Sequence, residues 1–427
     1  MEISILEGQT TQTYITCRVE NMNKHHFPLF RLLGSASIFQ IILSINVFAE
    51  IKRDYGTYPV PPPPPLPAAG GTIIDPTFET TIMRLTDAHD GPNCINSYSY
   101  WPTFNVNSTR ILVYSGRVPL LYRFDPVNFK ILDKVTWNTQ TPIGGSVRWD
   151  DAIWSGTDPD VIYAHDNIGM RLWTYNVATH TYTQIADLTA RYKPGDYLWQ
   201  MSKGIRHDNV FAFTRRDAGY NVVGYLVWKR GTNQVIYNVN TSRLDEVQVD
   251  KSGRYLVVKT GQQGAGVIEV KVVDLKTSTV ENLTDNGPDY APGHSDNGNK
   301  IVIGADNWRN KLTYRTLDNP HSRYTLINYG DDWTQDHHIS MLANNENWVL
   351  ISSYSSGTDG PFHDEIYQVA TDGSLAVRRM AHHFSIYGGD YYASPRADIS
   401  RDGHFVAFTS NWGVQGGRKD VFILKIP

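Results

Sequence analysis

A repeating pattern of short apolar segments constrains the fold of this chain more than any other feature. From about residue 80 onward, four such segments recur with a period of roughly 45–50 residues. The last copy is the clearest, with an entry strand at 397–400, a turn at 401–403 and an apolar strand at 405–410. Strand-length segments joined by turns of Asp, Asn and Gly predict antiparallel hairpins. A repeat of this size predicts four-stranded sheets arranged around a common axis.

The number of copies predicts seven such sheets, or blades. They begin near Tyr100, Gly145, Leu198, Glu246, Gly293, His337 and Ser394. The last copy ends the chain as a third strand at 421–425, whereas the apolar segment 81–86 precedes the first copy and belongs to none. We therefore predict an all-β, seven-bladed β-propeller over residues 80–427. Its N-terminal strand would complete the last blade and remove exposed sheet edges.

The composition agrees with this architecture and excludes one class of partner. Aromatic residues make up 12% of the 427 residues and charged residues only 19%, with 34 glycines and 22 prolines. Aromatic side chains suit pleated, half-buried surfaces, and Gly and Pro favour turns. The formal net charge is -4. Without a long run of Lys or Arg, the chain lacks the basic face that a nucleic-acid partner requires.

The N-terminal segment has the three-part layout of a secretory signal. A short basic start at 22–26 precedes the mostly apolar stretch 32–47, and Val47-Phe48-Ala49 forms a small-residue cleavage pattern. We expect residues 1–49 to be an extension with a signal peptide, translation to start at Met22, and the product to be secreted or periplasmic without a stable membrane span. The alternative is an uncleaved anchor, although the apolar stretch is shorter than the about 20 residues of a typical span.

A proline-rich segment separates this leader from the repeats. Residues 50–79 include the run Pro61–Pro65, followed by Pro67. Such a run adopts an extended polyproline II conformation and behaves as a stiff spacer. We therefore predict that residues 50–79 form a linker.

Polar residues near the starts of the innermost strands are the candidates for a functional site. These starts lie beside the axis at one mouth of a propeller channel, so residues far apart in sequence converge there. Catalytic roles are predicted for His294, His338, Arg396 and Tyr392. Substrate contacts are predicted for Tyr100, Trp101, Arg148, Gln200, Lys203 and Asp245. One divalent metal ion is predicted on His294, His337, His383 and Asp296.

These residue types fit two kinds of chemistry. Imidazole and carboxylate groups bind divalent metals, and imidazole also acts as a general base near neutral pH. β-Elimination from a uronic acid needs a cation such as Arg396 on the carboxylate, a base, and an acid for the leaving oxygen, while aromatic rings stack on sugars. The alternative interpretation is that the histidines hydrogen-bond between blades and fill the channel.

The turn Ser400-Arg401-Asp402-Gly403 resembles the repeats of TolB-like and WD40-like propellers. A weaker resemblance is to secreted polysaccharide lyases of the oligogalacturonate lyase type. That family is expected to hold a metal on the axis through histidines and a glutamine, with a His-Pro-His stretch at the last blade. Here Ser394-Pro395-Arg396 stands at that position, so both ligand positions are lost, while the resemblance implies that His294 corresponds to a ligand of an earlier blade.

Two functions from different classes follow. The first is a secreted, monomeric carbohydrate-active enzyme, a lyase acting on an acidic or neutral glycan. The second is a non-catalytic binding or scaffold propeller, which the TolB-like repeat and the lack of a complete catalytic motif favour.

Overall fold

The computed structural model describes residues 3–6, 14–17, 51–116, 118–261, 267–283, 292–306, 309–355 and 360–427. These residues belong to two compact units, 1–47 and 48–427. In the first unit, β1 (Ile3–Leu6) pairs antiparallel with β2 (Tyr14–Cys17). The predicted signal peptide, its start at Met22 and its cleavage site lie outside the described residues. Among the described residues, no helix has the length and apolar character needed to cross a membrane.

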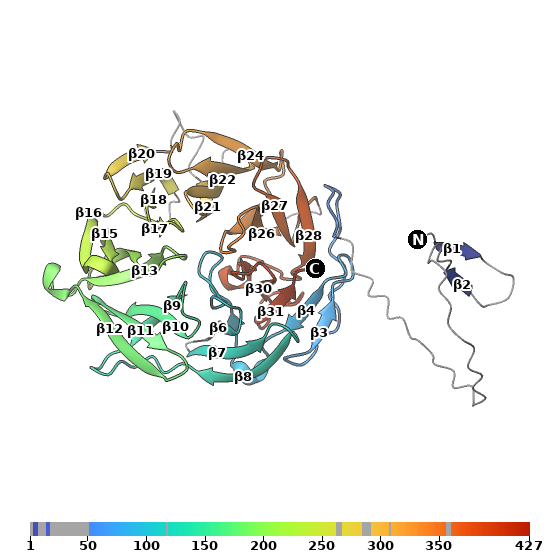
Figure 1. The fold of residues 1–427 in the computed structure, drawn as a ribbon, viewed down its shortest axis with the longest axis horizontal. Coiled ribbons are helices and arrows are strands. Elements are labelled where there is room, and N and C mark those ends of the chain that lie inside the picture. Colours follow the sequence, from blue (N-terminus) through green and yellow to red (C-terminus); the bar gives the residue numbers. More distant parts are fainter. Residues whose placement is uncertain are drawn as a thin grey trace, which may run out of the picture. The chain divides into compact units, whose positions relative to one another are not determined.

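The second unit is a ring of seven antiparallel sheets around one axis, which confirms the predicted seven-bladed propeller (Figure 1). Blade one contains β5 (Cys94–Ile95), β6 (Arg110–Ser115), β7 (Val118–Asp125) and β8 (Lys130–Thr136). Blade two contains β9 (Val147–Trp154), β10 (Val161–Asp166), β11 (Arg171–Asn176) and β12 (Thr181–Asp187). Blade three contains β13 (Tyr197–Lys203), β14 (Val210–Arg216), β15 (Val222–Lys229) and β16 (Gln234–Asn240). Blade four contains β17 (Glu246–Val249), β18 (Tyr255–Gly261), β19 (Val267–Asp274) and β20 (Thr279–Asn282).

The remaining blades follow the same order, from the axis outward. Blade five contains β21 (Pro292–Asn297), β22 (Ile301–Asp306), β23 (Lys311–Thr316) and β24 (Arg323–Asn328). Blade six contains β25 (Gln335–Ser340), β26 (Trp348–Ser355), β27 (Glu365–Ala370) and β28 (Val377–His382). Blade seven contains β29 (Asp398–Ile399), β30 (Phe405–Ser410), β31 (Asp420–Lys425), β4 (Thr81–Arg84) and β3 (Thr72–Ile74). Short 3₁₀ helices are η1 (Ala88–Asp90), η2 (Thr189–Arg191), η3 (Arg230–Thr232) and η4 (Tyr391–Ala393).

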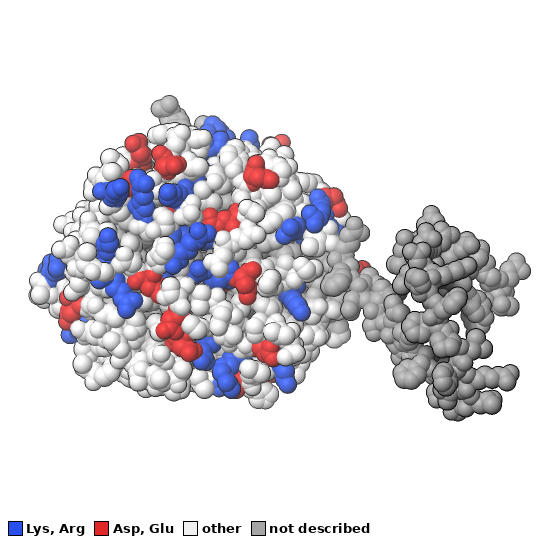
Figure 2. Space-filling model, viewed as in Figure 1, with Lys and Arg blue, Asp and Glu red and all other residues white. Residues whose placement is uncertain are grey.

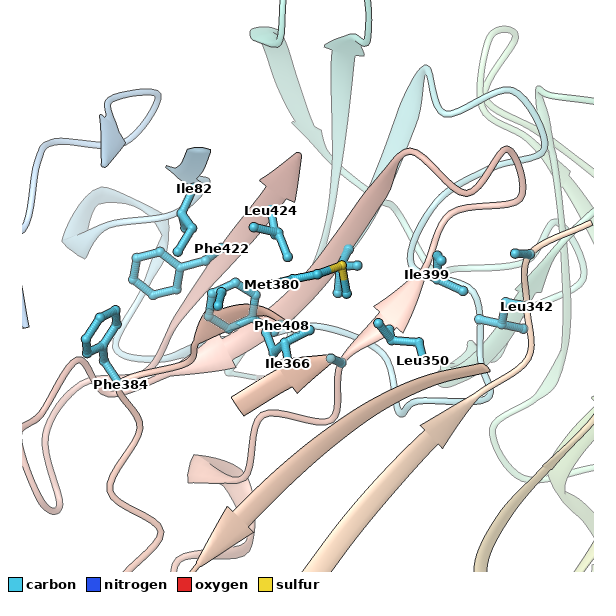
Figure 3. Packing of buried hydrophobic residues seen from close by; sticks show 14 of the residues in the cluster. Ile82, Leu342, Leu350, Ile366, Met380, Phe384, Ile399, Phe408, Phe422 and Leu424 are labelled. Carbon is cyan, nitrogen blue, oxygen red and sulfur yellow. The ribbon is translucent and has the colours of Figure 1, made fainter. Parts of the chain in front are cut away.

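The N-terminal strand closes the ring as predicted. β4 pairs antiparallel with β31, with Ile82 opposite Leu424 and Met83 opposite Ile423. Because alternate residues of a strand point to opposite faces, these two residues enter two different cores. Ile82 packs in the cluster shared with blade six, which includes Phe422 and Met380 (Figure 3), and Met83 packs in the cluster shared with blade one. Through these two side chains, β4 packs blade seven against both of its neighbours, blades six and one.

The proline-rich segment differs from the expected spacer, because it lies on the propeller. Trp412 Nε1 donates to the carbonyl of Pro64 at 2.8 Å, and Arg379 Nη1 donates to the carbonyl of Gly56 at 2.7 Å. His382 Nε2 lies 3.0 Å from the carbonyl oxygen of Tyr58. A polyproline stretch has no internal hydrogen bonds, so its carbonyls are free to accept bonds from side chains of blades six and seven. Further along, β3 adds a fifth strand to blade seven.

The surface carries mixed charge over the face seen along the axis. Figure 2 shows Lys and Arg interspersed with Asp and Glu there, separated by uncharged residues. This face presents no large field of a single sign.

The closing role of β4 predicts that substitutions of two isoleucines in the same sheet change the free energy of unfolding by very different amounts. Ile82→Ala should lower the free energy of unfolding by about 2–5 kcal/mol, since the side chain is fully buried between blades. Ile74→Ala, on the outermost strand with 54% of the residue exposed, should change it by less than about 0.5 kcal/mol. Urea unfolding followed by tryptophan fluorescence measures both. Equal effects would contradict the closure role of β4.

Candidate functional site

Extra residues in the innermost strands redirect side chains into one mouth of the channel. The pairing of the first strand with the second shifts register in blades two, three and five. In blade five, residues 293–294 together face Ala305, which takes His294 out of the regular ladder. Gln200 and Arg396 adopt left-handed backbone conformations, with φ of 48° and 44°. Bulges and strained residues of this kind are common beside functional sites, where they re-aim a side chain.

A loop from blade one crosses the axis. Ile95 pairs with Tyr114 and Phe104 pairs with Ile111, so residues 96–103 form an insertion, here called the axial loop. Trp101 Nε1 donates to the carbonyl of Met201 in blade three at 2.8 Å. Tyr100 Oη donates to Glu246 Oε2 in blade four at 2.6 Å. The axial loop therefore connects blade one to blades three and four across the channel, beside the mouth.

A histidine and an aspartate from adjacent blades form the central polar pair of this pocket. His294 Nδ1 lies 3.1 Å from Asp336 Oδ1. Asp336 also accepts bonds from Tyr354 Oη at 2.9 Å and from the backbone N–H of His337 at 2.8 Å. These hydrogen bonds, that of His294 foremost, hold the pKa of Asp336 well below its usual range despite its desolvation. An ionised carboxylate only accepts, so Nδ1 of His294 carries the proton and Nε2 is left as the basic atom.

His338 forms the wall behind this pair. Its ring stacks on His294 with centroids 4.7 Å apart and on Tyr354 at 5.0 Å, and Tyr98 meets it edge-on at 5.0 Å. Burial lowers the pKa of His338 well below its usual value. A neutral imidazole in a stack of this kind keeps the facing ring of His294 in one orientation.

Arg396 supplies a cation that makes no hydrogen bond to a carboxylate among the described residues. Only 4% of the residue is exposed, yet Nε and Nη2 have no hydrogen-bond partner among the described residues. Its guanidinium carbon lies 5.2 Å from the ring centre of Tyr391 and 5.6 Å from that of Tyr392. A buried charge is costly unless it is paired and hydrogen-bonded. This guanidinium therefore keeps two buried donor nitrogens that no described residue satisfies.

Aromatic residues surround these groups. Tyr391 and Tyr392 are 54% and 55% exposed at the rim. Tyr98, deeper in the mouth, lies tilted against Tyr100 with ring centroids 4.8 Å apart, and burial raises the pKa of both phenols well above the usual value. Both phenols therefore stay protonated at neutral pH and can donate a hydrogen bond or a proton.

A cleft of about 340 Å³ between blades five and six adjoins the mouth. Asp336 and Tyr354 form its inner wall, and Lys311, Gln335 and Trp333 line its outer part. Because Asp336 also contacts His294, the cleft and the axial mouth share one wall.

The fold gathers part of the predicted site. His294, His338, Arg396, Tyr392 and Tyr100 all belong to the axial mouth. Arg148 lies with its guanidinium carbon 3.4 Å from the ring centre of Trp199 and pairs with Asp150. Gln200 Oε1 accepts from Thr214 at 3.3 Å, and Asp245 is exposed beside Glu246.

Other predicted residues lie elsewhere or are already engaged. Lys203 is buried at the far end of its strand and pairs with Asp208 at 2.7 Å, so it does not reach the mouth. Trp101 is held by its bond to Met201. The reason is strand geometry, because successive side chains alternate in direction and a strand of several residues ends at the opposite face of the ring.

The predicted metal ligands do not assemble. His383 is buried, with Nε2 2.8 Å from the carbonyl of Ser353, and Asp296 accepts from the backbone N–H of Met341 at 2.6 Å. His337 stacks on Tyr329 at 4.2 Å instead. Within the described ranges, no group of three or more His, Cys, Asp or Glu residues is placed to hold a metal ion.

Two residues of the site escaped the sequence analysis. Tyr354 lies on β26 and Trp333 on the loop before β25, so neither begins an innermost strand. The position of Tyr354 could have been predicted from the sequence, because antiparallel pairing brings the end of the second strand beside the start of the first strand, at the mouth. Tyr354 indeed pairs with Asp336.

The buried His337 predicts an acid-dependent loss of stability. Desolvation lowers its pKa from 6.5 to about 4, so the unfolded chain takes up this proton at a higher pH than the folded one. Above pH 6.5 the neutral His337 leaves the free energy of unfolding unchanged by pH. As the pH falls from 6.5 to about 4, the difference between the two pKa values lowers the free energy of unfolding by up to about 3 kcal/mol. His337→Phe should therefore shrink the stability difference between pH 7 and pH 4.5 by about 2 kcal/mol.

Urea unfolding at the two pH values measures this difference. His207→Phe, at an exposed position in the turn after β13, serves as the control and should leave it unchanged. The interpretation fails if His337→Phe loses as much stability on acidification as the unsubstituted protein.

Comparison with known proteins supports the fold. No protein-family model and no curated protein matches the sequence. The structure is similar to an oligogalacturonate lyase from Vibrio parahaemolyticus, with 12% identity, a TM-score of 0.61, and coverage of 84% of this chain and 99% of that one. It is also similar to an oligogalacturonate lyase in complex with manganese, with 12% identity, a TM-score of 0.59, and coverage of 89% and 99%. At this identity the likeness shows the fold, and this chain is a seven-bladed β-propeller of the same architecture.

The resemblance implies a metal on the axis, which the residues of this chain do not fit. Arg396 stands where the lyase pattern has a histidine, and its unpartnered guanidinium repels a cation. His294 is committed through Nδ1 to Asp336, and no third ligand joins them among the described residues.

Proposed function

We propose that this chain binds a uronic acid residue in the axial mouth and cleaves the adjoining glycosidic bond by β-elimination. The observation that carries the proposal is the buried Arg396 guanidinium with two unpartnered nitrogens, in the same aromatic pocket as the His294–Asp336 pair. A planar guanidinium matches a carboxylate through two parallel hydrogen bonds. Exposed tyrosines above it provide stacking surfaces for a sugar ring.

The reaction assigns each group one task. Arg396 neutralises the uronate carboxylate and thereby acidifies the neighbouring C5–H. His294 Nε2 takes the C5 proton, and the electron pair forms the C4–C5 double bond as the C4–O bond breaks. Tyr98, which stays protonated and lies 6.3 Å from the His294 ring between centroids, gives its proton to the leaving oxygen. Asp336 is a positioning residue, because it holds the tautomer that leaves Nε2 free.

The electrostatic surroundings favour this division of labour. His338 is kept neutral by burial between His294 and Arg396, so it adds no charge to the pocket. The axial loop crosses the channel beside the site, and a bound sugar displaces water from the base and from the guanidinium. Desolvated hydrogen bonds to a developing carbanion charge are stronger than the same bonds in water.

Substitution of the base tests the proposal. His294→Gln should lower kcat on galacturonate oligomers by about 100- to 10,000-fold, the usual contribution of a positioned base. The matched control is His207→Gln, which changes an exposed histidine in the turn after β13 and should keep full activity. Absorbance of the unsaturated product measures the rate. Absence of this product from acidic glycans with the unsubstituted protein would refute the proposal.

Substitutions at Arg396 and Asp336 separate binding from positioning. Arg396→Gln should weaken binding of the oligomer and lower kcat, and Arg396→Lys should recover only part of both, because Lys keeps the charge without the bidentate geometry. Asp336→Asn should lower kcat by about tenfold or more without raising KM, because it disturbs the tautomer and orientation of the base and removes no contact that holds the substrate. Calorimetric titration and steady-state kinetics distinguish these patterns. A rise in KM alone for Asp336→Asn would remove its positioning role.

A further inference from the structure

The cleft between blades five and six extends the proposed site in a particular direction. We infer that it binds a neutral sugar residue next to the uronate, so that the substrate is a mixed glycan of alternating uronate and neutral sugars. This inference rests on the proposed function, since it takes the uronate to lie in the axial mouth. The cleft holds about 340 Å³ and shares Asp336 and Tyr354 with the mouth.

The polar groups of the cleft are suited to sugar hydroxyls. Gln335 Nε2 donates to Asp332 at 2.7 Å and to the carbonyl of Pro361 at 3.1 Å. This arrangement points the amide oxygen the other way, and Oε1 is buried without a hydrogen-bond partner among the described residues. An unpaired buried acceptor is costly, and a sugar hydroxyl that donates to it removes the cost.

An exposed tryptophan provides the stacking surface. Trp333 is 56% exposed at the outer edge of the cleft, although residues of its size usually bury most of their surface in a monomer. The face of an indole binds the apolar face of a pyranose ring while the equatorial hydroxyls reach polar groups around it. Ser355 and Asn310 contribute such polar groups to the same cleft.

The charges of the cleft disfavour a second uronate. Its charged residues are Asp306, Asp336 and Lys311. Two carboxylates and one ammonium group leave this lining with an excess of negative charge, and Lys311 lies opposite Asp306 in the pairing of β22 with β23. The remaining carboxylate, Asp336, would face the carboxylate of an incoming uronate, and juxtaposed like charges are strongly unfavourable. A neutral sugar avoids this repulsion, whereas the guanidinium of Arg396 reserves the mouth for the acidic residue.

The test compares two tetrasaccharides of equal length. One is a homopolymer of galacturonate, and the other alternates galacturonate with rhamnose. Binding to the His294→Gln protein, whose turnover is expected to be about 100- to 10,000-fold slower, is measured by calorimetry. We expect the alternating tetramer to bind at least about tenfold more tightly, as expected when one like-charge contact is avoided. Trp333→Ala should reduce this preference to about twofold or less, because stacking on the neutral sugar is lost.

Two further variants control the experiment. Tyr324→Ala removes a partly exposed aromatic side chain on β24, outside the cleft, and should keep the preference intact. Thr334→Lys places a cation on the cleft wall and should raise affinity for the homopolymer several-fold, which a purely steric preference would not do.

The outcomes separate this inference from the proposed function. Equal or tighter binding of the homopolymer, abolished by Arg396→Gln, would overturn the mixed-glycan inference and leave the uronate site standing. A preference that survives Trp333→Ala would show that the cleft is not its source. Failure of both tetramers to bind would overturn the proposed function and this inference with it.

Discussion

The pairing of β4 with β31 is the contact on which the rest of the structure depends. It joins the two ends of a chain segment of more than 300 residues through four cross-strand pairs and places Ile82 and Met83 in the cores on either side. A propeller blade buries its faces only against its neighbours, so an open ring would leave two blades with an uncovered apolar face. Closure also sets the distance between inner strands, and that distance defines the mouth.

The axial mouth is held rigidly, and it contains buried polar atoms that have no hydrogen-bond partner among the described residues. Bulges and left-handed residues direct His294 and Arg396 toward the axis, and stacked rings hold His294 from behind. The axial loop is fixed across the channel by its bonds to Met201 and Glu246. A desolvated guanidinium without a partner is a cost that the folded chain carries alone. An anion that binds there would offset this cost, which is the physical basis of the proposed acidic ligand.

The sequence predicted the fold more completely than the site. The hydrophobic period located seven inner strands and the closing strand, because burial against neighbours repeats from blade to blade. It also indicated His294, His338 and Arg396, which follow from their position at strand starts. It misplaced Lys203 and His383, since a shift of a few residues along a strand reverses the direction of a side chain or moves it to another face.

By itself, the sequence determined the architecture and the residue types available at one mouth, because strand period and turn chemistry are local properties. Only the tertiary structure decided which of those residues meet, since the contact between His294 and Asp336 joins different blades and depends on a bulge that no local pattern marked. The proline-rich segment makes the same point. Its composition predicts an extended chain, and the side chains of blades six and seven, distant in sequence, decide that this chain lies on the ring.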